Sequence, residues 1–393
     1  MSVWDGLVGQ RPAIAALAPA AREGRGMTHA WLFTGPPGSG RSNAAIAFAA
    51  ALQCERGGCG ECHDCRTVLA GSHADVGVIR TQRLSIGVDQ VRDLVRRSAL
   101  APVGRRWQVL VVEDADRLTD QAFNALLKAI EEPTERTVWM LCAPTVEDVL
   151  PTIRSRCRLV TLTTPAAADV AAFLERTCDV PPDLAAYAAR ASQGHIGRAR
   201  ALATDEATRQ RRAAVVALPG RLRSLGAAMT AAATLNETTR QEAEAITVEL
   251  DAAERADLDA AYGVVERGRR PREYAPARAA LEREQKSRAK RRHLDVVDRA
   301  LTDLVSVYRD AVALAVGAGG ELVNEELRDD VQVLADQRGA EGCLRCIDAI
   351  FAAREQMLEF NVPVMLALES MAAGLLPTTG GVGAGTSTRV GDA

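Results

Sequence analysis

The chain has few aromatic residues and almost no excess of charge of either sign. Only 4% of its 393 residues are Phe, Trp or Tyr, and 48 Lys and Arg are balanced by 51 Asp and Glu, for a net charge of -3. A nearly neutral chain lacks the global electrostatic signature of a nucleic-acid-binding protein. Any contact with DNA must therefore come from a local patch or be shared with partner chains.

Membrane-spanning and targeting segments are also missing. No apolar run approaches the roughly 20 residues of a membrane helix. The N-terminal segment MSVWDGLVGQ has the pattern of neither a signal peptide nor a transit peptide. We therefore expect a soluble, cytoplasmic protein, whose nine cysteines serve as metal ligands or buried thiols rather than in disulfides.

Apolar residues are abundant, at 47% of a chain long enough for two or three domains. Strand-like and helix-like stretches alternate over residues 1–163, which predicts an α/β nucleotide-binding core with a parallel sheet. From Pro165 onward the strand patterns vanish. We expect a small helical unit over 164–203, a longer all-α domain over 204–377, and a disordered Gly/Ser/Thr-rich tail over 378–393.

Five short segments outline the predicted core. Residues 31–34, 109–112 and 138–141 are apolar runs suited to buried parallel strands. Residues 43–51 follow the first strand and its glycine-rich turn. They are rich in alanine, which favours helix. Residues 121–131 carry apolar side chains at i, i+3, i+4 and i+7, which predicts a helix with one buried face.

A glycine-rich segment, GPPGSGRS, joins the first predicted strand to its helix. Its Gly35, Gly40 and Ser42 match the spacing of a phosphate-binding loop, with Gly38 as a further candidate nucleotide-binding residue, but Arg41 stands where that loop needs lysine. Lysine reaches the phosphates as a compact charge, whereas arginine is longer, planar and forked. We expect weak nucleotide binding at most and impaired turnover; the alternative is an ordinary glycine-rich turn.

An acidic pair, Glu113 and Asp114, follows the predicted strand at 109–112. A P-loop ATPase needs Asp at this place to hold Mg²⁺ and then Glu to activate the attacking water. Here the order of the two acids is reversed. Together with Arg41, this order predicts that hydrolysis is lost and that ATP and Mg²⁺ are doubtful cofactors. The alternative is an ordinary pair of acids at a strand end.

Four cysteines lie within twelve residues, which predicts a closed structural zinc site. Free thiols and an iron–sulfur cluster are the alternatives, and His63 is a possible substitute ligand. The four predicted ligands are Cys54, Cys59, Cys62 and Cys65. By contrast, Cys343 and Cys346 sit in a helical pattern with no second pair, so we expect them to be buried packing residues.

Two basic segments remain. Residues 152–157, TIRSRC, form a basic turn. An arginine on a rigid turn suits an arginine finger, a side chain that stabilises charge on the γ-phosphate of a nucleotide. The alternative is an ordinary solvated arginine. Residues 267–292 are highly charged and broken by two prolines. We interpret this second stretch as a solvated helix or linker, with a DNA-contacting patch as the alternative.

Together these motifs resemble the bacterial clamp-loader branch of the AAA+ ATPases. The resemblance spans most of residues 4–377, although 204–340 carries little motif. The residues that carry it are WLFTGPPGSG (31–40), the cysteine cluster after the loop helix, FNALLKAIEEP (123–133), SRC (155–157) and NVPVMLALE (361–369).

The resemblance implies an AAA+ core, a helical lid and a helical collar that assembles a pentamer. Arg156 would reach into the ATP site of a neighbouring subunit. Gly197 stands where the family has its sensor arginine, and Arg198 lies one step away. The implied partners are ATPase subunits of gamma/tau type, a delta subunit, the sliding clamp and, through the complex, primer–template DNA, in the bacterial cytoplasm near the nucleoid.

With three altered positions in its own site and an intact finger, the chain matches the family's non-hydrolysing stator. Its own ATPase activity is expected to be absent. One alternative is an active motor subunit in which Arg41 still works. The other is a zinc-dependent nucleic-acid-binding module with a vestigial phosphate loop.

Overall fold

The computed structural model describes residues 2–81, 85–104, 106–263 and 271–377. Two compact units contain them, one formed by residues 1–211 and 244–292 and the other by 212–243 and 293–393. Residues 244–292 thus group with the first unit, whereas the sequence suggested one helical domain over 204–377. The domain boundaries given in the sequence analysis stay a prediction. The tail at 378–393 and residues 267–270 of the charged stretch lie outside the described residues.

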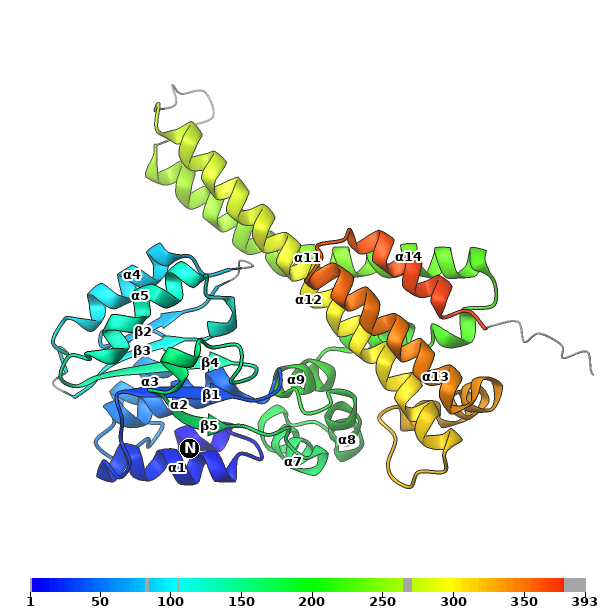
Figure 1. Cartoon of the computed structure of the whole chain (residues 1–393), viewed down its shortest axis with the longest axis horizontal. Helices are drawn as coiled ribbons and strands as arrows, with labels where there is room; N and C mark the ends of the chain where they lie inside the picture. The colour runs from blue at the N-terminus through cyan, green and yellow to red at the C-terminus, as the bar shows by residue number, and fades with distance from the viewer. Residues whose placement is uncertain (1, 82–84, 105, 264–270, 378–393) are drawn as a thin grey trace, which may run out of the picture. The chain divides into compact units, whose positions relative to one another are not determined.

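A five-stranded parallel sheet forms the centre of the first unit (Figure 1), as the sequence predicts. The strand order is β2-β3-β4-β1-β5. The strands are β1 Ala30–Thr34, β2 Val76–Ile79, β3 Gln108–Val112, β4 Thr137–Ala143 and β5 Arg158–Thr161. The three expected strands are present. The sequence did not indicate β2, in which Gly77 interrupts the apolar run, or β5, in which three of the four residues are exposed.

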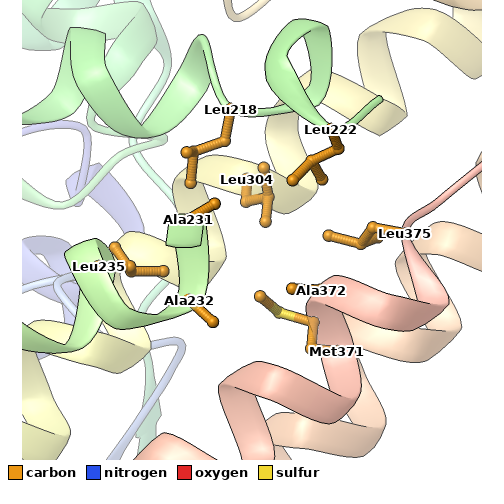
Figure 2. A pocket seen from close by; sticks show the side chains of 9 residues that line it. All are labelled: Leu218, Leu222, Ala231, Ala232, Leu235, Leu304, Met371, Ala372 and Leu375. Carbon is orange, nitrogen blue, oxygen red and sulfur yellow. The ribbon is translucent and has the colours of Figure 1, made fainter. Parts of the chain in front are cut away.

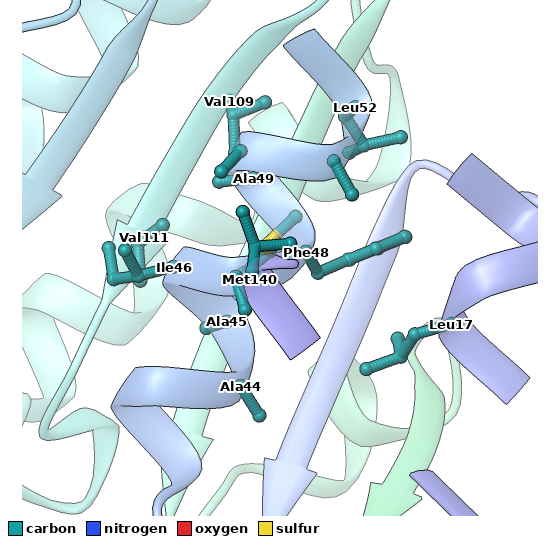
Figure 3. Packing of buried hydrophobic residues seen from close by; sticks show 14 of the residues in the cluster. Leu17, Ala44, Ala45, Ile46, Phe48, Ala49, Leu52, Val109, Val111 and Met140 are labelled. Carbon is teal, nitrogen blue, oxygen red and sulfur yellow. The ribbon is translucent and has the colours of Figure 1, made fainter. Parts of the chain in front are cut away.

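Helices cover both faces of this sheet because successive side chains of a buried strand point to opposite sides. Trp31 and Phe33 pack under α1 (Arg11–Glu23) and α2 (Arg41–Gln53), whereas Leu32 packs on the other face. Helices α4 (Val88–Ser98) and α5 (Asp120–Glu131) cover that second face. Figure 3 shows α2 lying on the sheet through small alanine side chains, with Phe48 and Met140 filling the layer.

A helical lid follows the sheet and has its own small core. It consists of α7 (Ala167–Cys178), α8 (Pro182–Ala191) and α9 (Ile196–Thr204). Leu174 and Leu202 are fully buried among alanines of the three helices. The predicted helical unit after residue 164 is thus present.

Long helices make up the rest of the chain, and no described residue after Thr161 lies in a strand. They are α10 Glu206–Val216, α11 Leu225–Ala261, α12 Tyr274–Ala315, α13 Arg328–Leu358 and α14 Val364–Gly374. Cys343 and Cys346 are buried in the core of the second unit, as expected. None of the helices in the described ranges is long and apolar enough to cross a membrane.

A small cavity lies inside the second unit (Figure 2), between α11, α12 and α14. Its volume is about 10 Å³, and its lining is entirely apolar, including Leu235, Leu304 and Met371. A buried water needs about that much room and also two or more polar partners. The cavity is therefore a dry packing gap and not a binding site.

Candidate functional site

The phosphate-loop segment connects β1 to α2, as the sequence predicts, and the lid packs directly on it. Gly38 has a φ of +80°, and a Cβ atom there would lie 2.2 Å from Cγ of His195. The Ile196 amide, at the start of α9, also donates to the Gly38 carbonyl at 3.4 Å. No sequence motif marks His195, yet its ring fills the space beside Gly38 that the side chain of a larger residue would need.

Arg41 is the first residue of α2, and its guanidinium turns back onto the loop. It donates to the carbonyl oxygen of Gly35, so the loop's own backbone holds its charge. Burial lowers the pKa of Arg41, and the nearby carboxylates of Asp116 and Asp114 oppose that shift. Gly40 caps the helix with a φ of +93°, and Ser42 is half-buried in the first turn.

The acidic pair lies at the carboxyl end of β3, and an arginine contacts each member. Strand register pairs Ile79 with Val112, which makes Arg80 the neighbour of Glu113. Arg80 Nε donates to Glu113 Oε1 at 2.8 Å. Burial raises the pKa of Glu113, and the bond from Arg80 opposes that rise.

Asp114 is contacted from a distant helix, by Arg291 of α12. Arg291 Nη2 lies 3.5 Å from Asp114 Oδ2, and its Nη1 donates to the Thr81 carbonyl at 2.7 Å. Mg²⁺ needs an octahedral set of oxygens, usually one or two carboxylates with waters and phosphates. With both carboxylates held by guanidinium groups, the residues present do not fit a Mg²⁺ ion.

Arg156 lies on the exposed turn between α6 (Pro151–Arg154) and β5. Its guanidinium donates to the Thr152 carbonyl at 2.6 Å and pairs with Glu131 at 3.0 Å. Exposed pairs of this kind contribute about 0–1 kcal/mol. Arg198, in contrast, is half-buried in the first turn of α9, close to the residues that contact Gly38.

The four predicted zinc ligands converge on one point. Their sulfur atoms all lie within 4.8 Å of one another. Cys54 Sγ is 3.6 Å from Cys59 Sγ and 3.7 Å from Cys62 Sγ. Four thiolates at about 2.3 Å from a tetrahedral ion would be separated by about 3.8 Å, so the donor set fits structural zinc.

Backbone amides further favour thiolates in this cluster. The amides of Cys59, Cys62 and Cys65 approach the preceding cysteine sulfurs at 3.4–3.5 Å. Bonds from the Glu61 and Cys62 amides lower the pKa of Cys59 to about 6. Burial raises the pKa of Cys65, a shift that a bound cation would oppose. Zinc would tie the first turn of α3 (His63–Leu69), which contains Cys65, to the end of α2.

One family of known proteins matches the N-terminal part of the chain. Residues 9–166 match the family described as "DNA polymerase III, delta subunit". The chain is 36% identical over 178 residues to the DNA polymerase III subunit gamma/tau of Mycobacterium bovis, covering 44% of this chain and 31% of the relative. It is 35% identical over 199 residues to the DNA polymerase III subunit delta' of Escherichia coli, covering 49% and 59%.

A solved structure of a DNA polymerase III gamma subunit-related protein from Thermotoga maritima is similar over most of the length. It covers 92% of this chain and 98% of that one, at 17% identity and a TM-score of 0.39. The curated matches, by contrast, span 31% of the gamma/tau relative and 59% of the delta' relative.

A parallel sheet with a phosphate-loop turn after β1, followed by a helical lid, is the arrangement of a P-loop nucleotide-binding core. Over residues 9–166 the chain is similar to DNA polymerase III delta-type subunits, and in part of its length it is similar to subunits of delta' and gamma/tau type.

Proposed function

We propose that the chain is the non-hydrolysing stator of a DNA polymerase III clamp loader. It would complete the ATP site of a neighbouring gamma/tau-type subunit, in a pentamer that also contains a delta subunit. The assembly would open a sliding clamp and load it on primer–template DNA. The zinc module and the inactive site would then serve as scaffold.

The observation that carries this proposal is the contrast between two arginines. Arg41 is turned onto the Gly35 carbonyl within its own loop, whereas Arg156 is exposed on a turn and held only by surface contacts. An arginine supplied in trans stabilises charge that develops on a neighbour's γ-phosphate. Arg156 can leave Glu131 at little cost, because exposed ion pairs are weak.

The test is an Arg156→Ala chain reconstituted with the other loader subunits. In known GTPases a finger contributes roughly 10³–10⁵ in rate. We expect clamp loading to fall by at least about tenfold, while bulk ATPase falls less because the other sites keep their own fingers. Arg154→Ala, at the exposed last residue of α6 just before that turn, is the matched control and should load normally. Equal loading by both variants would refute the role of Arg156.

The second candidate function is an active ATPase motor. The match to a gamma/tau subunit over 178 residues favours it. Against it are the guanidinium groups on Glu113 and Asp114. An ATPase assay on the isolated chain separates the two functions. The stator predicts negligible turnover, also in Arg41→Lys, whereas the motor predicts turnover that Arg41→Ala abolishes.

A further inference from the structure

Residues 244–261 of α11 and 274–292 of α12 form a helical arm that belongs to the first unit. Polar contacts join its two helices. Arg288 is buried and pairs with Asp251 at 2.5 Å and with Glu254. Gln285, also buried, donates to the Asp251 carbonyl at 3.0 Å. These bonds fix α12 against α11 one turn before Arg291.

From that position Arg291 joins the ends of two strands. One guanidinium nitrogen donates to Thr81, just after β2, and the other pairs with Asp114, just after β3. Thr81 is buried, and a buried carbonyl without a donor is costly. The side chain of Arg291 is itself only 13% exposed. The contact is therefore part of the packed structure and not a fluctuating surface pair.

Arg80 completes the arrangement from the neighbouring strand end. Parallel register places Arg80 beside Glu113. Its guanidinium bonds this carboxylate, whereas Arg291 bonds Asp114. Arg41 adds a third guanidinium, whose pKa responds to Asp114 and Asp116. Three cations thus surround the acids, where an ATPase would hold a divalent ion between carboxylate and phosphate.

We infer that the acidic pair Glu113–Asp114 is an intramolecular docking site for the arm, in which Arg291 and Arg80 take the electrostatic role of a divalent metal. Arginine suits this role because its fork can bond two groups at once and its charge is permanent. The reversed order of the acids then has a structural use, since neither carboxylate has to coordinate a metal. This inference concerns the chain's own site and does not depend on the proposed role of Arg156.

A double-mutant cycle on the full chain tests the docking contact. Arg291→Gln and Asp114→Asn should each raise amide exchange over residues 113–119 and 285–292 by about tenfold, and the double variant should add little. Lys286→Gln, at an exposed position of the same helix, is the matched control and should exchange like the original chain. Additive effects, or no change in either single variant, would overturn the inference.

A metal titration tests the second half of the inference. Paramagnetic resonance with Mn²⁺, alone and with ATP, should detect no ion whose binding depends on Glu113 in the original chain. The variant Arg80→Ala/Arg291→Ala exposes both carboxylates and should gain Mn²⁺ binding, which Glu113→Gln then removes. Mn²⁺ binding by the original chain that Glu113→Gln abolishes would overturn the inference, as would a failure of the double variant to bind the ion.

Discussion

At the residue scale, the contact between His195 of the lid and Gly38 packs the lid against the phosphate loop. His195 lies so close to Gly38 that no side chain fits there. Gly40, two residues on, also has a positive φ but has open space around its Cβ position. Substitution of either glycine therefore tests the free-energy cost of a positive φ, and only substitution of Gly38 also tests the steric cost of the contact with His195.

Gly38→Ala should be more destabilising than Gly40→Ala. Both changes place a Cβ in a left-handed conformation, which costs roughly 1–2 kcal/mol. Only Gly38→Ala also collides with His195, and such overpacking adds about 1–3 kcal/mol. Urea unfolding measures both. His195→Ala in the Gly38→Ala background should recover most of the difference, and equal stabilities of the two single variants would contradict the lid contact.

At the scale of elements, the cysteine module is a short loop fixed to a packed helix. The carbonyl of Gly58 accepts bonds from the Val3 amide and the Ser2 hydroxyl. Cys54 and Cys65 are buried against α2. Zinc binding would therefore stabilise a local module whose surroundings already have an apolar core.

Cys62→Ser should release zinc and lower the thermal stability while leaving the rest of the fold intact. A structural ion contributes its binding free energy to folding, and three thiolates leave the tetrahedral site open. Elemental analysis should find about one zinc per chain before the change. Cys178→Ser, half-buried and outside the cluster, is the control. A soluble, metal-free original chain would refute the site.

Within the second unit, a buried arginine of α10 bonds residues of two other segments. Arg212 bonds Asp303 at 3.2 Å, Asn324 at 2.5 Å and Glu326 at 3.1 Å. Its side chain is only 2% exposed. This one residue therefore links α10, α12 and the turn before α13.

Arg212→Ala should lower the free energy of unfolding by about 3–5 kcal/mol, because it leaves the Asp303 charge buried without its partner. Arg211→Ala removes a half-exposed arginine that pairs with Asp205 and should cost no more than about 1 kcal/mol. Chemical denaturation followed by circular dichroism compares the two. Similar losses in both variants would show that the buried network is not specifically stabilising.

At the scale of the whole molecule, the second unit leaves an apolar stripe on α13. Leu344, Phe351 and Leu358 are 49%, 46% and 52% exposed. Their seven-residue spacing places them on one face of the helix. In the proposed pentamer this stripe would pack against helices of a neighbouring loader subunit.

Phe351→Asp should weaken assembly with gamma/tau-type and delta subunits while leaving the isolated chain folded. A charge at the centre of an apolar contact is unfavourable, and a central aromatic residue commonly contributes about 2 kcal/mol or more. Analytical ultracentrifugation of the mixed subunits measures the loss. Val103→Asp, at an exposed position of the first unit, should assemble normally. Undiminished assembly of Phe351→Asp would exclude the stripe from the interface.

Local features of this protein were readable from the sequence because their residues are neighbours along the chain. The glycine turn, the buried strands at 31–34 and 109–112 and the cysteine cluster each depend on spacing within about a dozen residues. Hydrophobic periodicity was enough to predict the α/β core and the helical remainder. Short β5 was missed because three of its four residues are exposed and break the pattern of a buried strand.

The state of the acidic site was decided only by the tertiary structure. Arg80 and Glu113 are 33 residues apart, and Arg291 and Thr81 are 210 apart. The sequence shows that Glu113 and Asp114 are in an unusual order, but not which charges face them. Sheet register brings Arg80 to Glu113, and the packing of a long helix brings Arg291 to Asp114. Charge interactions depend on distance in space, and folding alone sets that distance.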